Sequence, residues 1–116
     1  MPVAPALSIR DRIKLIQAQA IVGGVTPSQV RENLMLLTGL FGSVLDEHRE
    51  ADAAYMRVVV GYVELGDPVN KAEMRASISP EYARAREAKD TERLVLEMIR
   101  GAKRYLESLD TEMRLT

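Results

Sequence analysis

The sequence contains no cysteine and no tryptophan, and it has a single histidine and a single phenylalanine. The lack of cysteine excludes disulfide bridges, thiolate zinc sites and a cysteine nucleophile. Aromatic residues make up only 4% of the 116 residues, which argues against base-stacking sheets such as those of OB-folds and RRMs. No apolar run approaches the roughly 20 residues of a membrane span, and the opening MPVAPALSIRDR lacks the pattern of a secretion signal. These absences predict a cytoplasmic protein without a membrane partner.

An excess of charge of one sign is lacking as well. Lys and Arg number 16 against 17 Asp and Glu, so the net charge is −1. A polyanion therefore gains no attraction from the overall charge and needs a local basic surface, or one built by several copies. Neither the G-x-S-x-G pattern of a nucleophilic serine nor the phosphate-loop pattern occurs. We expect a protein that is not an enzyme and that uses no cofactor and no metal.

Capping signals divide the chain into four predicted helices and an N-terminal arm. Ser8 and Thr26 each stand three residues before an acidic or amide side chain, as N-cap residues do, and Ser79 precedes a proline that suits the first helical turn. GDP at 66–68 ends a helix, because glycine caps its C-terminus and proline blocks a further turn. NKAE at 70–73 provides another capping box. The predicted elements are an extended arm at 1–7 and helices at 9–22, about 27–64, 71–77 and 80–114.

The predicted helix over 27–64 carries the strongest pattern in the sequence, an apolar position every four and three residues in alternation. Such a heptad seam is typical of coiled coils and helical bundles. Gly39 and Gly42 weaken the helix, and they either kink it or let a neighbouring backbone approach. The seam residues are Val30, Leu34, Leu37, Phe41, Val44, His48, Ala51, Tyr55, Val58 and Tyr62.

A similar repeat that includes Val95 and Ile99 marks the predicted helix over 80–114. Together the two long helices predict an all-α fold, a long helical hairpin with a coiled-coil-like seam that forms one domain over 1–116. A helix over 27–64 is about 57 Å long, and shorter helices of the same chain would leave part of its seam uncovered. We therefore expect the seam to drive self-association into a homo-oligomer.

His48 and Asp52 stand four residues apart in the acidic segment DEHREAD at 46–52, a spacing that metal ligands use. The sequence offers no second histidine and no E-x-x-H pair to complete a ligand set. We therefore interpret His48 as a polar seam residue within a solvated acidic patch.

The predicted helix over 80–114 carries its cations on one side. With Ile99 at heptad position a, five Lys and Arg residues occupy the adjoining positions b and e. Such a row of cations can bind successive phosphates of a nucleic acid and release their counterions. Alternatively, it can be a solvated flank, a solvent-exposed side of the helix with i to i+4 ion pairs such as Lys103 with Glu107. We call these five residues the basic stripe and include Arg104, which lies beside them. Its members are Arg86, Lys89, Arg93, Arg100, Lys103 and Arg104.

From about Val44 onward, the order of features resembles the UvsY-like recombination mediators of T-even phages and their relatives. The resembling residues are AEMR at 72–75, the turn at Ile78 and Ser79, and a long helix that ends in GAKRYLESL at 101–109. The resemblance implies a small all-helical phage protein that forms rings, binds single-stranded DNA and helps to load a recombinase onto strands covered by single-strand-binding protein. It also implies DNA contacts at Lys71 and Arg75, and more loosely at Arg100, Lys103 and Arg104.

We therefore expect a homo-oligomer that binds single-stranded DNA and assists recombination in the cytoplasm of a bacterial host. A recombinase or a single-strand-binding protein would be a further partner. Two alternatives remain open. A phage structural, assembly or adaptor protein would use the seam for protein partners alone, and a small protein inhibitor would present the segment DEHREAD as a mimic of phosphates.

Overall fold

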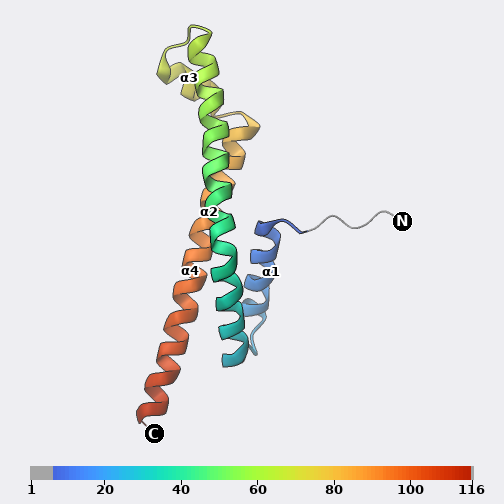
Figure 1. Cartoon of the computed structure of the whole chain (residues 1–116), viewed down its shortest axis with the longest axis vertical. Coiled ribbons are helices and arrows are strands. Elements are labelled where there is room, and N and C mark those ends of the chain that lie inside the picture. Colours follow the sequence, from blue (N-terminus) through green and yellow to red (C-terminus); the bar gives the residue numbers. More distant parts are fainter. Residues whose placement is uncertain (1–6, 116) are drawn as a thin grey trace, which may run out of the picture. The chain divides into compact units, whose positions relative to one another are not determined.

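The computed structural model describes residues 7–115, so the predicted arm at 1–7 lies outside the described residues except for Leu7. Within this range the chain is all-α, with four helices and no strand, and the two long helices pack against each other (Figure 1). The predicted all-α hairpin is confirmed. None of the helices in the described range has the length and apolarity needed to cross a membrane. The helices are α1 (Ile9–Val22), α2 (Pro27–Glu64), α3 (Val69–Ala76) and α4 (Pro80–Leu115).

Side-chain caps fix the starts of three helices. The backbone N–H of Asp11 donates to Oγ of Ser8 over 3.1 Å and so satisfies one open donor of α1. Thr26 and Gln29 form a reciprocal capping box, with bonds of 3.2 Å to Oγ1 of Thr26 and 2.9 Å to Oε1 of Gln29. The hydroxyl of Ser79 caps α4 in the same way over 3.2 Å. The predicted starts of α1, α2 and α4 are thereby confirmed.

Gly66 ends α2, as the sequence predicts. Its φ of 106° lies in the left-handed region, where a residue with a Cβ would be strained. The N–H of Gly66 donates to the carbonyl of Val63 over 3.0 Å, and the N–H of Asp67 donates to the carbonyl of Tyr62 over 3.1 Å. This pair of bonds is a Schellman motif, which satisfies two carbonyls at the end of the helix.

The start of α3 differs from the prediction. The helix begins at Val69, directly after the N-cap residue Pro68, which has a φ of −59° and a ψ of 153°. No side chain of the described residues caps this helix start with a hydrogen bond. Asn70 already lies inside the helix, so the predicted capping box NKAE is wrong. A proline can occupy this position because the first turn of a helix does not need its missing N–H. The helix therefore spans Val69–Ala76 rather than 71–77.

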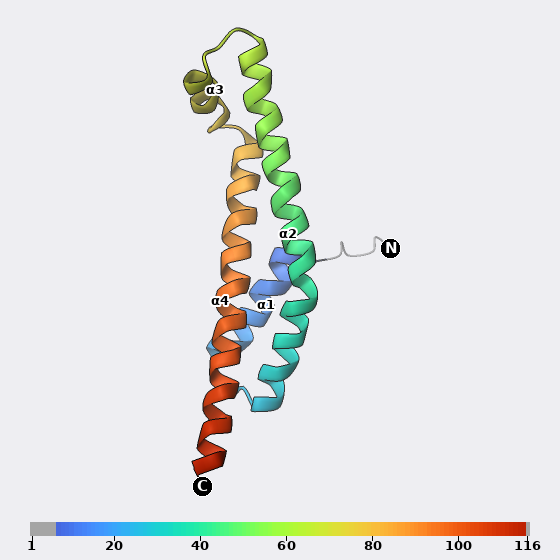
Figure 2. The same cartoon turned by 60° about the vertical axis from the view of Figure 1, so that its left-hand side comes forward.

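The chain divides into two compact units that share the two long helices. Unit 1 combines Met1–Gly42 with Leu94–Thr116, and unit 2 consists of Ser43–Arg93. In unit 1, α1 lies beside the N-terminal part of α2 and the C-terminal part of α4 (Figures 1 and 2). In unit 2, α3 lies beside the C-terminal end of α2 (Figure 2).

Each helix of unit 1 contributes one large apolar side chain that is fully buried. Ile13 of α1 and Val95 of α4 have no exposed surface, and Leu37 of α2 is 2% exposed. Leu37 and Val95 belong to the predicted apolar repeats, so the heptad pattern identifies the contribution of both long helices to the core of this unit.

Small side chains form much of the core of unit 2. Ala51 of α2 packs with Ala85 and Ala88 of α4, and the ring of Tyr55 covers this cluster. A second cluster joins α2 to α3 through Val59, Ala72 and Ala76, with Tyr55, Val58 and Tyr62 packed against it. Because the distance between two helices depends on the side chains at their contact, alanines allow close packing.

The seam of α2 is covered by the chain itself. Leu37, Val44 and Ala51 are buried, and the other seam residues from Val30 to Tyr62 are half-buried. α4 has 36 residues and so nearly matches the 38 residues of α2. Burial of Leu37, Val44 and Ala51 thus requires no second copy, and the role of the seam in self-association stays a prediction. Large apolar residues that stay exposed elsewhere on α2 are Met35, Leu36, Met56, Val60 and Val63.

Gly39 and Gly42 lie inside α2, which continues through both positions. A Cβ added at either glycine would meet no atom of the described residues within 4 Å. No close approach of another helix in the described part of the chain therefore explains these glycines. Each lowers helix stability by about 1 kcal/mol relative to alanine.

Candidate nucleic-acid interface

The basic stripe lies on the exposed side of α4. All six of its side chains are exposed, and none of them forms an ion pair with a described residue. The pair of Lys103 with Glu107, expected for a solvated flank, is thus not formed. Unit 2 holds Arg86, Lys89 and Arg93, and unit 1 holds Arg100, Lys103 and Arg104.

In unit 2 the basic stripe borders a groove of about 400 Å³ between α2 and α4. Tyr55 of α2 and Tyr82 of α4 line this groove, and their ring centroids lie 5.4 Å apart with the ring planes tilted by 54°. This is a favourable geometry for an aromatic pair. We call the space the tyrosine groove, bounded by these two rings and by the side chains of Arg86, Lys89 and Arg93.

Two carboxylates, those of Asp52 and Asp90, also line the tyrosine groove. The Asp52 carboxylate lies 3.2 Å from Nε2 of His48, whose Nδ1 contacts the carboxylate of Glu92 on α4. His48 therefore lies between carboxylates of both long helices, which agrees with its interpretation as a polar residue of the seam. Within residues 7–115, no group of three or more His, Asp and Glu side chains is arranged to hold a metal ion.

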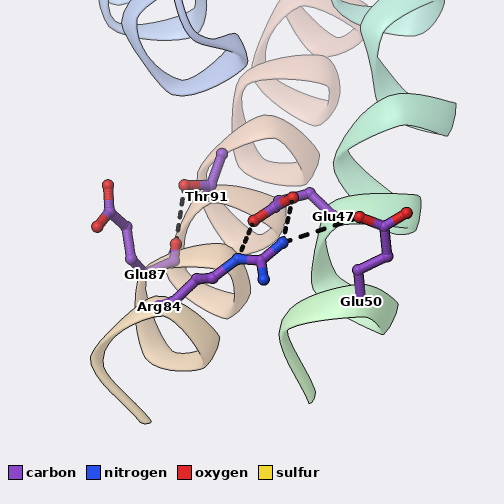
Figure 3. A network of polar contacts seen from close by, with 5 residues as sticks. All are labelled: Glu47, Glu50, Arg84, Glu87 and Thr91. Carbon is purple, nitrogen blue, oxygen red and sulfur yellow. Dashed lines mark hydrogen bonds and ion pairs between the residues drawn. The ribbon is translucent and has the colours of Figure 1, made fainter. Parts of the chain in front are cut away.

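The acidic segment DEHREAD is largely paired with cations of the same chain. Nε and Nη2 of Arg84 donate to the two carboxylate oxygens of Glu47 over 2.8 and 3.1 Å, and Glu50 lies 3.8 Å from the same guanidinium (Figure 3). The hydrogen bond from Arg84 lowers the pKa of Glu47, and the same bond raises the pKa of Arg84. Asp46 is 3.7 Å from Arg49. The pairs with Arg84 join α2 to α4, and all of these pairs reduce the negative surface that a phosphate mimic would need.

Lys71 and Arg75 of α3 are engaged within unit 2. Nη1 of Arg75 donates to Oδ2 of Asp67 over 2.6 Å, and its guanidinium lies 4.3 Å from the ring centroid of Tyr62. Nζ of Lys71 lies 3.9 Å from Oδ1 of the same aspartate. In contrast to the basic stripe, these two predicted DNA contacts already share a carboxylate, so a phosphate would have to compete with Asp67.

A second cavity, of about 370 Å³, lies between α1, α2 and α4 within unit 1. Its lining is apolar apart from Asn33 and Tyr105 and contains no charged side chain from the described residues. Gly101 opens onto this cavity, and a Cβ at this position would meet no described atom within 4 Å. The cavity does not resemble a site for phosphates, which require cationic or N–H donors.

The sequence prediction missed the tyrosine pair as part of the candidate interface. Tyr55 is predicted only as a seam residue, and Tyr82 belongs to no predicted set. Tyr82 nevertheless stands four residues before Arg86 and shares heptad position e with Lys89. Extending the basic stripe by one helical turn toward the start of α4 would have included Tyr82 in the candidate interface.

A scan against models of protein families gives no match, and searches of curated proteins and of solved structures give none either. The chemistry of this chain, above all the basic stripe and the tyrosine groove, is therefore the basis for inferring a function.

Proposed function

We propose that the protein is a non-enzymatic, homo-oligomeric helical accessory protein that binds single-stranded DNA and assists recombination. The supporting observation is the basic stripe, whose six exposed cations have no ion-pair partner among the described residues. Exposed cations without an ion-pair partner can contact the phosphates of DNA and release its condensed counterions, which favours binding of the DNA. The resemblance of 72–75 and 101–109 to UvsY-like mediators supports the recombination part of the proposal.

Self-association belongs to the proposal because one chain alone is a weak polyanion binder. Its net charge is −1, so only the local stripe attracts DNA. Several copies on one strand would act together and raise the apparent affinity by avidity. Large apolar side chains exposed on α2, such as Met56 and Val60, offer surface for contacts between copies.

A salt titration with a labelled single-stranded oligonucleotide tests the proposed function. If all six cations of the basic stripe contact phosphates, the logarithm of the affinity should fall with the logarithm of the salt concentration with a slope of about −4 per chain. Fluorescence anisotropy measures the affinity at each salt concentration. Failure to bind the oligonucleotide at low salt would contradict the proposal.

A phage assembly or adaptor protein is the second candidate, and the exposed apolar residues of α2 favour it. Such a protein would self-associate to the same extent with or without an oligonucleotide. The inhibitor hypothesis has less support, because Glu47 and Glu50 bind Arg84 and Asp52 contacts His48. Its acidic face is already paired within the chain.

A further inference from the structure

The geometry points to a base-binding subsite in the tyrosine groove of unit 2. In this arrangement a base of a single strand enters the groove and contacts the tyrosine rings, while the neighbouring phosphates bind Arg86, Lys89 and Arg93. The inference rests on the proposed function and adds to it a means of telling single strands from duplexes.

The residues of the tyrosine groove differ in exposure as such a subsite requires. Ala85, which lines the groove, is 8% exposed, and Tyr55 and Tyr82 are half-buried. The three cations at the border are exposed. A base can therefore reach an aromatic surface inside the groove while its charged backbone remains at the border. The volume of about 400 Å³ lies in the range of small-molecule sites.

The arrangement follows from the periodicity of α4. Tyr82, Arg86, Lys89 and Arg93 are spaced by four, three and four residues, so they share one face of the helix. α2 contributes Tyr55 from the opposite wall. The aromatic surface and the phosphate-binding cations thus occupy the same groove within one compact unit.

Stacking on an aromatic side chain tolerates any base, because every base has a π-face, and it strengthens binding roughly five- to 150-fold per base. The faces of the bases in a duplex are covered by their neighbours, so a duplex could use only the cations. Asp52 and Asp90 add acceptors but no donors, which favours a base with an exocyclic amino group such as cytosine. The expected ligand is therefore single-stranded nucleic acid that contains such bases.

The test compares a dC homopolymer with an abasic oligomer of the same length, which carries the same phosphates but no bases. The wild-type protein should bind the dC oligomer at least about fivefold more tightly, whereas both oligomers should show a similar salt slope. Tyrosine emission should be quenched by the dC oligomer alone, and it can be followed directly because the chain has no tryptophan.

Two variants assign the effect to the groove. Tyr82→Leu should remove the preference for the dC oligomer, and Tyr82→Phe should keep it because the ring remains. Tyr105→Leu is the matched control, since Tyr105 lies on α4 but lines the cavity of unit 1. Equal binding of the two oligomers by the wild-type protein would overturn the subsite and leave the proposed function standing. Binding of neither oligomer at low salt would overturn both.

Discussion

Leu37→Asp should unfold the chain rather than only separate an oligomer into single chains. Leu37 is 2% exposed in the core of unit 1, so the substitution would both remove a packed side chain and bury an unpaired charge. Losing a buried leucine costs about 2–5 kcal/mol and an unsatisfied charge adds to it, which approaches the total stability of a typical domain. We expect far-UV circular dichroism to show loss of helix at room temperature.

Met35→Asp is the matched control for this substitution. Met35 lies two residues away on α2 and is 75% exposed, so an aspartate there should change the free energy of unfolding by about 0.5 kcal/mol or less. A Leu37→Asp protein that stays helical and only loses mass in sedimentation would contradict the account. That result would mean that a second copy, and not the chain itself, covers the seam at Leu37.

Neutralising three cations of the basic stripe should weaken the binding of single-stranded DNA by about a hundredfold at 0.1 M salt. Each phosphate contact contributes about 0.7 to the salt slope for single strands, so three lost contacts should reduce the slope by about 2. Two triple variants divide the stripe by unit. One replaces Arg86, Lys89 and Arg93 with glutamine, and the other replaces Arg100, Lys103 and Arg104.

The control for both triple variants removes three positive charges that lie outside the basic stripe. Lys14, Arg31 and Arg57 are exposed, lie on α1 and α2, and form no ion pair with a described residue. Their replacement with glutamine should leave the salt slope nearly unchanged, because only local contacts with phosphates release counterions. If this control weakens binding as much as the stripe variants do, the attraction comes from the overall charge and not from α4.

The ends of the helices could be predicted because they depend on neighbouring residues. The capping side chains of Ser8 and Thr26 and the left-handed Gly66 act within a few residues of their own position. The same local logic failed at α3, where the capping pattern NKAE predicted a helix that starts at residue 71. The helix begins directly after the proline, and Asn70 becomes an ordinary helical residue.

The contacts between helices could not be predicted in the same way. The bond between Arg84 and Glu47 joins residues 37 positions apart, and the contact of His48 with Glu92 joins residues 44 positions apart. Both depend on the register in which α2 lies against α4. Apolar periodicity shows which face of each helix is buried, but it does not fix this register. The pairing of Tyr55 with Tyr82 escaped prediction for the same reason.

The most direct test of the central claim is sedimentation velocity of the wild-type protein at low salt, with and without a single-stranded oligonucleotide. The account predicts a species heavier than one chain that gains the mass of the oligonucleotide when it is added. Raising the salt concentration should release the oligonucleotide, because its binding depends on the basic stripe. A species with the mass of one chain that the oligonucleotide leaves unchanged would contradict the account.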